Sequence, residues 1–378
     1  MSVKNNKKTN ISRREFLRIS AGVGVGLLAT ACGASAPAAA PTSAPAAVAN
    51  EELEKELNVL NWGSYIDFAI KPFEEKYGCK VNIEYYGGED EAITKVKASP
   101  GKYDTFNIGV GFLEPAVKQG LVQPLDVSRI ASYNDMYPEF QPGPFEVDGQ
   151  IYGLCYSFGS NALMYNSELI PAGVDSWSAF TDPQFKGKTS LVDKPKDQYL
   201  AAMLTLGLDF TQPKEEDFDK VKQVMKDRVA NMRTLWSSGD DITRFMINKE
   251  VVLADAYDGL TAQIAKEYPA IKYKVPQEGT YGWFDGPELL TGAPHPNLTY
   301  KWIEFVTSPE MAKLVAEQVN YSPANSKVPQ MISAELRTQL GLDDPGATLK
   351  GLKYWVNLGP DWDRRIADAW TEAKAGAA

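Results

Sequence analysis

The sequence predicts an α/β fold with two lobes. The chain has 378 residues, which is too long for one compact core and suggests two. Apolar runs with the period of strands alternate with runs with the period of helices, first over 57–120 and again from about 186. This alternation is typical of a largely parallel sheet covered by helices.

The first series begins with a short apolar strand over 57–61. A helical stretch follows it, with Phe68, Phe73 and Tyr77 on one side and Gly78 as its end signal. Residues 80–86 alternate between apolar and polar, as a strand does. The other expected elements of this series are a helix over 89–98, a strand over 103–108 and a helix over 112–119.

The second series is expected to contain two strands and two extended segments. The strands are expected over 189–192 and 251–256, and the extended segments over 229–235 and 271–275. The helices are expected over 198–206, 215–228, 241–248, 261–267, 297–307, 309–319 and 362–374. We expect segments 151–165 and 281–290 to cross between the lobes. The cleft beside such crossings is where small-ligand sites tend to form.

The first 32 residues have the layout of a signal peptide. Basic residues precede a short apolar run over 19–31, and Cys32 follows it. The run is too short to cross a bilayer. Ser12-Arg13-Arg14-Glu15-Phe16-Leu17-Arg18 resembles the twin-arginine export signal. Leu28-Ala29-Thr30-Ala31-Cys32 resembles a bacterial lipobox.

These resemblances imply an exported protein. A lipid on Cys32 would hold it at the outer face of the membrane, in the periplasm or at the cell surface. Residues 33–56 begin with a stretch rich in Ala, Pro and Ser, so we expect a tether there. Export permits a disulfide between Cys79 and Cys155, but we expect two buried free thiols.

Charge and composition exclude several kinds of function. The formal net charge is −10; without residues 1–32, 33 basic residues face 48 acidic ones, a net charge of −15. An acidic body disfavours nucleic acid as a partner and is compatible with cationic ligands. The chain has one histidine, His295, and three cysteines. A catalytic triad based on histidine and a zinc site with several His or Cys ligands are therefore excluded or nearly so. We expect no cofactor and no metal.

Five short motifs follow one another along the chain. They are Asn61-Trp62-Gly63-Ser64-Tyr65, KQGLVQPLD over 118–126, Tyr257-Asp258-Gly259, Trp283-Phe284-Asp285 and AKLVAEQVNYSPAN over 312–325. In order and spacing they resemble the bacterial periplasmic spermidine/putrescine-binding proteins, which serve ABC importers. The resemblance implies the two-lobed type II periplasmic-binding-protein fold, with a hinge and an interlobe ligand cleft. It implies lobe 1 over 57–159 and 283–325, and lobe 2 over 160–282 and 326–378.

The resemblance also implies a ligand and its site. Members of the family close on a polyamine between aromatic rings and carboxylates, which suits ammonium groups. Carried over, Trp62 and Tyr65 would be rings of the first lobe, and Tyr257 and Trp283 further rings. Asp285 would hold one amine. The remaining implied contacts are Asp197 as a second carboxylate, Ser238 as a hydroxyl contact and Tyr321 near the hinge.

The chain departs from the family in two places. Lys194 stands where the family has an acid, although the adjacent Asp193 could substitute for it. Residues 108–111 lack the family's serine and aromatic residue, and Phe112 is the nearest ring. A shorter diamine, an amino acid or another cation could therefore fit instead.

Other interpretations remain open from the sequence alone. Trp62 and Trp283 could pack in a core, Asp285 could lie in a turn and Asp197 could cap a helix. The helix start at 109–111 could bind an anion, although the expected cleft is richer in rings and acids.

Two further classes of function differ more from a transport receptor. The first is a glycosidase, whose paired acids could be Asp193 with Asp197 or Asp255 with Asp258. The second is a lipid-tethered scaffold that binds no ligand. We expect no enzyme, but a monomeric binding protein whose partners are a small cationic solute, a membrane permease and the membrane itself.

Overall fold

The computed structural model describes residues 53–63, 65–354 and 358–376. Glu51–Ala378 form one compact unit, here called the folded body. The expected signal peptide over 1–32, with Arg13, Arg14 and Cys32, and most of the tether lie outside the described residues. Among the helices that are described, none is long and apolar enough to cross a membrane.

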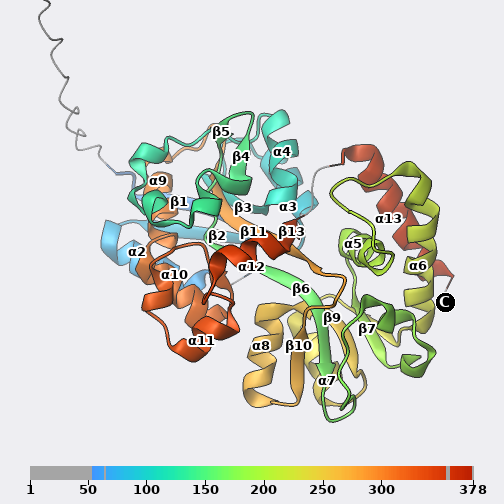
Figure 1. The fold of residues 1–378 in the computed structure, drawn as a ribbon. Coiled ribbons are helices and arrows are strands. Elements are labelled where there is room, and N and C mark those ends of the chain that lie inside the picture. Colours follow the sequence, from blue (N-terminus) through green and yellow to red (C-terminus); the bar gives the residue numbers. More distant parts are fainter. Residues whose placement is uncertain (1–52, 64, 355–357, 377–378) are drawn as a thin grey trace, which may run out of the picture. The chain divides into compact units, whose positions relative to one another are not determined.

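A single large sheet runs through the folded body (Figure 1). Its main path is β2-β1-β3-β11-β6-β9-β7-β8, and β10, β12 and β13 pair beside it. The strands are β1 (Glu56–Trp62), β2 (Lys80–Tyr86), β3 (Thr105–Gly109), β6 (Ser157–Asn166), β7 (Thr189–Val192), β8 (Thr234–Trp236), β9 (Leu253–Tyr257), β10 (Ile271–Lys274), β11 (Thr280–Leu289), β12 (Ser322–Pro323) and β13 (Leu352–Tyr354). A separate hairpin joins β4 (Glu146–Val147) and β5 (Gln150–Ile151).

The two ends of the sheet are parallel and its centre is antiparallel. β1 pairs in parallel with β2 and β3, and β7 pairs in parallel with β8 and β9. Between them β11 and β6 run antiparallel to each other and to their outer neighbours. The two predicted βα series are thus confirmed, and the predicted crossing segments supply the two central strands.

Helices cover the sheet in both halves (Figure 1). They are α2 (Ile70–Tyr77), α3 (Glu89–Ala98), α4 (Val110–Lys118), α5 (Pro195–Thr205), α6 (Phe218–Asn231), α7 (Gly239–Ile247), α8 (Asp258–Glu267), α9 (Pro296–Val306), α10 (Pro309–Leu314), α11 (Ala334–Gln339), α12 (Pro345–Gly351) and α13 (Pro360–Ala375). Short 3₁₀ segments lie between several of them, and a π-helical turn over Val315–Val319 follows α10.

Local chemistry explains where two of these helices end. α2 ends at Gly78, whose φ of 63° lies in the left-handed region that glycine enters without strain. The prediction of an extended segment over 229–235 is wrong in its first half. Val221, Met225 and Val229 are buried at a spacing of four residues, so their apolar stripe carries α6 on to Asn231.

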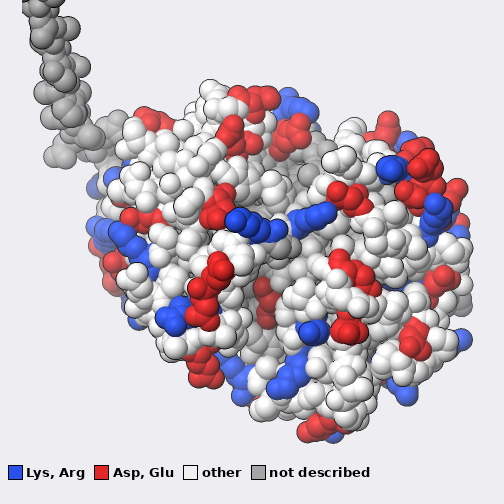
Figure 2. All heavy atoms as spheres, in the orientation of Figure 1, with Lys and Arg blue, Asp and Glu red and all other residues white. Residues whose placement is uncertain are grey.

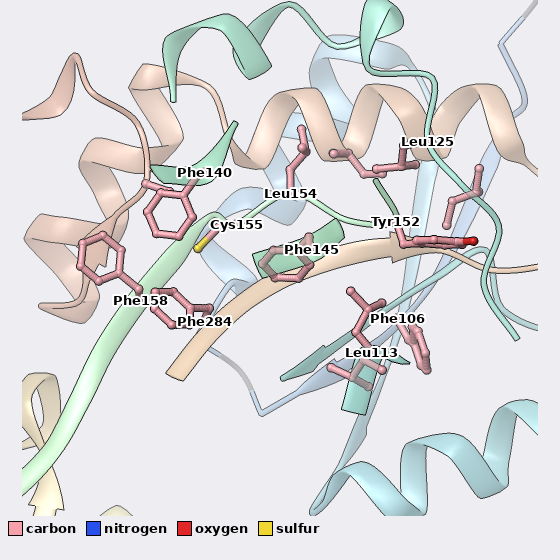
Figure 3. Packing of buried hydrophobic residues seen from close by; sticks show 14 of the residues in the cluster. Phe106, Leu113, Leu125, Phe140, Phe145, Tyr152, Leu154, Cys155, Phe158 and Phe284 are labelled. Carbon is pink, nitrogen blue, oxygen red and sulfur yellow. The ribbon is translucent and has the colours of Figure 1, made fainter. Parts of the chain in front are cut away.

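Separate hydrophobic cores fill the two halves. In the first half, aromatic and aliphatic side chains from β3, β6, β11 and the loops before β6 pack together (Figure 3). In the second half, α5, α6 and α13 contribute to another core, with Trp177 and Trp370 fully buried. Residues between Val328 and Leu349 belong to the first core, and Ile366 and Trp370 to the second. The predicted lobe boundaries remain a prediction, and these contacts favour moving 326–352 into lobe 1.

Candidate ligand-binding site

The candidate site lies where β1 and β3 end and β11 passes them. Trp62 is the last residue of β1, and Tyr65 follows in the next turn. In the strand register, Asp285 of β11 lies opposite Gly109, the last residue of β3, and opposite Ser157 of β6. The carboxyl ends of parallel strands are common ligand positions in such sheets.

Asp285 is held by a tyrosine from the first half of the body. The Tyr65 hydroxyl donates a hydrogen bond to Asp285 Oδ2 at 3.2 Å. The same hydroxyl accepts a bond from Asn107 Nδ2 at 2.9 Å, and the Tyr65 ring stacks on Tyr156 with centroids 5.9 Å apart. Packing and hydrogen bonding therefore fix the carboxylate before any ligand arrives.

The surroundings of Asp285 favour the protonated form of its carboxyl group. Burial raises the pKa of Asp285 to about 7, and the charge of Glu89 adds to this, while Tyr65 and Lys194 pull the pKa down. Glu89 stands in the first turn of α3, and a Cβ placed on Gly109 would lie 3.7 Å from its Oε1. An ammonium group beside these two carboxylates would compensate their charge.

Two aromatic rings lie on the same side of the central strands. The rings of Trp283 and Tyr321 meet edge to face, with centroids 4.6 Å apart. A Cβ on Gly159 would overlap the Trp283 ring, and a Cβ on Gly259 would overlap the Tyr321 ring. Glycines at these two positions are therefore required for both rings to sit as they do.

Trp62 and Tyr257 are connected through a lysine. The ammonium group of Lys194 lies 4.1 Å from the centroid of the Trp62 ring and 5.4 Å from that of Tyr257. Tyr257 also packs edge to face on Trp236, at 5.9 Å. Six predicted site residues thus fall into two neighbouring groups, one around Asp285 and one around Lys194. They are Trp62, Tyr65, Tyr257, Trp283, Asp285 and Tyr321.

The two other predicted contacts have partners of their own. Asp197, in the first turn of α5, accepts hydrogen bonds from the Tyr281 hydroxyl at 3.1 Å and from Asn161 Nδ2 at 3.2 Å. Ser238 is exposed and caps α7, where its Oγ accepts a bond from the backbone N–H of Asp241. Helix capping accounts for Ser238 without a ligand.

The alternative acids do not form catalytic pairs. Asp193 accepts bonds from Trp370 Nε1 at 2.7 Å and Lys374 Nζ at 2.8 Å, both in α13. The suggestion that it replaces the family acid at Lys194 is therefore wrong, because α13 holds its carboxylate. Asp255 is fully buried beside Arg228.

Asp258 also has a structural role. Its carboxylate accepts bonds from the backbone N–H groups of Ser160 and Gly259. The two pairs suggested for a glycosidase, Asp193 with Asp197 and Asp255 with Asp258, therefore have separate partners instead of facing one substrate.

The start of α4 is a poor place for an anion. Gly109 is its N-cap residue, but it lies opposite Asp285 and beside Glu89. Two carboxylates there oppose the attraction of the helix terminus for negative charge. A hollow of about 270 Å³, lined by Phe140, Phe284 and Tyr354 among others, contains none of the predicted site residues.

Three residues of this region were not among the predicted contacts. Asn107 and Tyr156 support Tyr65, and Glu89 raises the pKa of Asp285. A polar Asn107 inside the apolar run 105–109 was a usable signal in the sequence. Nothing in the sequence near Glu89 distinguished it from an ordinary acid in the first turn of a helix.

The chain is similar to known binding proteins over most of its length. Residues 69–341 match the family described as bacterial extracellular solute-binding protein. The putrescine/cadaverine-binding protein of Pseudomonas aeruginosa is 24% identical over 87% of this chain and 96% of its own length. The spermidine/putrescine-binding periplasmic protein of Escherichia coli is 24% identical over 79% of this chain and 86% of its own length.

A solved structure gives the same result for the fold. The spermidine/putrescine ABC transporter substrate-binding protein of Streptococcus pneumoniae superposes with a TM-score of 0.75, at 21% identity, over 86% of this chain and all of that one. The predicted α/β fold, the two-lobed architecture of periplasmic binding proteins, is thereby confirmed, and the hinge and the interlobe ligand cleft remain predictions. The chain belongs to the family of bacterial extracellular solute-binding proteins.

Proposed function

We propose that this protein is the extracytoplasmic substrate-binding component of an ABC importer and that it binds a small aliphatic amine of the polyamine class between its lobes. Relatives of similar length are named for putrescine, cadaverine and spermidine. Membership of a solute-binding family favours binding over catalysis, and no cofactor is needed for this role.

The observation that carries the proposal is the group of residues around Asp285. A carboxylate with a raised pKa is fixed by the Tyr65 hydroxyl, and Glu89 adds a second negative charge. Trp283 and Tyr321 supply rings on the same side of the sheet. Carboxylates bind an ammonium group through charge-assisted hydrogen bonds, and rings bind both the ammonium and the methylene groups beside it.

The transport mechanism follows from residues on both halves of the body. Trp62, Tyr65 and Asp285 would bind the amine from lobe 1, and Tyr257 with Asp197 from lobe 2. A ligand that contacts both lobes favours the closed arrangement. The closed monomer would then dock on the membrane permease, whose ATPase drives uptake.

Export and attachment to the membrane are part of the same proposal. Arg13 and Arg14 would direct export through the twin-arginine pathway, and a lipid on Cys32 would hold the body by its tether. The test is fractionation of cells that produce the wild type or Cys32→Ser. We expect the wild type in the membrane fraction and the variant in the soluble extracytoplasmic fraction. An unchanged distribution would refute lipid attachment at Cys32.

A thermal-shift screen tests the proposed ligand class. The folded body Glu51–Ala378 would be heated with putrescine, cadaverine, spermidine, basic and acidic amino acids, sulfate and a phosphonate. A ligand that binds the native state raises the melting temperature with the logarithm of its concentration over Kd. We expect a shift with aliphatic amines. A shift with sulfate or the phosphonate alone would refute an amine site and leave the transport role.

A further inference from the structure

The second group of the candidate site has a cation of its own. Lys194 follows β7 and is the N-cap residue of α5. Its ammonium group lies over the Trp62 ring at 4.1 Å and near the Tyr257 ring at 5.4 Å. A ring face at this distance is a favourable place for an ammonium group. Lys194 therefore occupies the position in which a ligand ammonium would otherwise meet these two rings.

Lys194 keeps its charge and interacts directly with the Tyr257 side chain, but it has no carboxylate as its partner. Burial lowers the pKa of Lys194, yet Tyr257, Asp197 and Glu89 together outweigh burial and raise the pKa above its ordinary value. Within the described part of the chain, no carboxylate forms an ion pair with this ammonium group. A half-buried cation without an adjacent anion favours an acidic group on whatever binds next to it.

A second donor in the site also lacks an acceptor. The indole N–H of Trp283 is buried and has no hydrogen-bond partner in the described residues. A buried donor without an acceptor destabilises the site, and a ligand oxygen that accepts from it would remove that cost. Within the described residues, Lys194 thus lacks an anionic partner and Trp283 lacks an acceptor, whereas no ammonium group is paired with Asp285.

We infer that the solute carries a carboxylate as well as an ammonium group. It would be a short aliphatic amino acid whose ammonium group binds at Asp285 and whose carboxylate binds Lys194. The inference rests on the proposed function for the ammonium group at Asp285, and at the other end of the solute it replaces the second ammonium group of a polyamine by a carboxylate. A second ammonium group there would meet the charge of Lys194, and like charges repel.

The two ends of the solute would lie close together. Lys194 lies over the ring of Trp62, and Tyr65, three residues further along the chain, donates a hydrogen bond to Asp285. A short methylene chain would pack between the rings that stand near both charges. This favours chains of about the length of putrescine over spermidine, because longer chains would need space beyond Lys194.

Calorimetric titration of the folded body tests the inference. The ligands are 4-aminobutyrate and 5-aminopentanoate, putrescine as the diamine, and butyrate as a carboxylate without an amine. We expect the amino acids to bind at least tenfold more tightly than putrescine. Lys194→Ala and Lys194→Gln should each weaken amino-acid binding by about ten- to a hundredfold, the range of a charge-assisted contact. Lys194→Glu should reverse the preference and favour putrescine.

Controls separate this inference from its alternatives. Lys186→Ala removes an exposed lysine between β6 and β7 and should change no affinity, and each variant's melting temperature without ligand reports its folding. If putrescine binds the wild type as tightly as the amino acids, or Lys194→Ala leaves amino-acid binding unchanged, the ligand carboxylate does not bind Lys194 and the inference is wrong. If none of the amines binds, the proposed function itself fails.

Discussion

The binding of an amine should depend strongly on pH, because Asp285 must be ionised to hold an ammonium group. Burial, with Glu89 beside it, raises the pKa of Asp285 to about 7. At pH 8 the carboxylate is mostly ionised and ready to bind. At pH 5 it carries a proton in nearly every molecule, and that proton must leave before the ammonium group can pair.

The size of the effect follows from this pKa. Two pH units below it, only about 1% of the carboxyl groups are ionised. The affinity should therefore fall by about tenfold per pH unit below 7, and by about a hundredfold from pH 8 to pH 5. In the absence of ligand, the stability of the fold depends on pH in the opposite direction to the affinity for the amine. Since the pKa in the folded state lies above the ordinary value near 4, this group stabilises the fold at low pH, and that stabilisation is lost as pH rises through 7.

The assay is calorimetric titration at pH 5, 6, 7 and 8. Buffers with different ionisation enthalpies also report the proton released on binding. Asp285→Asn should bind more weakly, by about 1.5–3 kcal/mol, and should lose the pH dependence. The other charged groups near the site include Glu89, Lys194, Asp197, Asp258 and Glu288. Burial also raises the pKa of Asp258 to about 7.

Two results would refute the reasoning about Asp285. One is an affinity that stays constant from pH 5 to pH 8. The other is a pH dependence that persists in Asp285→Asn, which would transfer the titration to Asp258. As a matched control, Asp209→Asn removes an acid whose carboxylate pairs with Lys353, and it should leave both affinity and pH profile unchanged.

Three further predictions concern packing, a buried ion pair and the thiols. Gly159→Ala should weaken ligand binding at least tenfold in titration, because the added Cβ would overlap the Trp283 ring. Arg228→Met should lower the free energy of unfolding by about 3–5 kcal/mol in urea, because it leaves buried Asp255 without its cation. Both cysteines of the folded body are free as expected, but only Cys155 is buried, and the expected burial of Cys79 is wrong because it is partly exposed. Unfolded protein should therefore show two reactive thiols, and a reductant should leave the melting temperature unchanged.

Matched variants make these three predictions specific. A Cβ on Gly88 would meet nothing within 4 Å, so Gly88→Ala should bind normally. Arg233 pairs with Glu250 at 3.2 Å while about half exposed, so Arg233→Met should cost less than about 1 kcal/mol. Equal effects in Gly88→Ala and Gly159→Ala, or in the two arginine variants, would contradict the structural reasoning. A single reactive thiol would contradict the third prediction.

The alternation of elements was predictable because each strand and helix leaves a local pattern. The segments predicted to cross between the lobes, 151–165 and 281–290, overlap the strands β6 and β11. The error at 229–231 arose because Val229 favours a strand by its branched side chain but lies on the buried stripe of α6. Packing against neighbouring helices decided that segment, and a local pattern does not contain such contacts.

The candidate site was likewise predictable from the sequence only in part. Residues at strand ends, such as Trp62 and Asp285, could be proposed from their places in the sequence. The contacts that Asp193 and Lys194 make could not be predicted from the sequence. Asp193 is held by α13, about 180 residues further along the chain, while the side chain of Lys194 extends to the ring at the end of β1. Contacts of this kind depend on how distant elements pack.

The central claim is that an aliphatic amine binds at Asp285 among the rings of Trp62, Trp283 and Tyr321. The most direct test is a crystal structure of the folded body grown with the amine that gives the largest melting shift. We predict its ammonium nitrogen within hydrogen-bonding distance, about 3 Å, of the Asp285 carboxylate. Density for the amine elsewhere, for instance in the hollow beside Phe284 and Tyr354, with the Asp285 region unchanged, would contradict the claim.

The distribution of charge on the face of the body seen in Figure 2 helps to separate specific from non-specific binding of an amine. Acidic and basic side chains are interspersed there, and the view shows no extended field of one sign (Figure 2). Attraction to this face as a whole would not account for binding of an amine. A structure with the ammonium group at Asp285 would therefore assign recognition to the site itself, and one with amines scattered over surface carboxylates would assign it to non-specific charge.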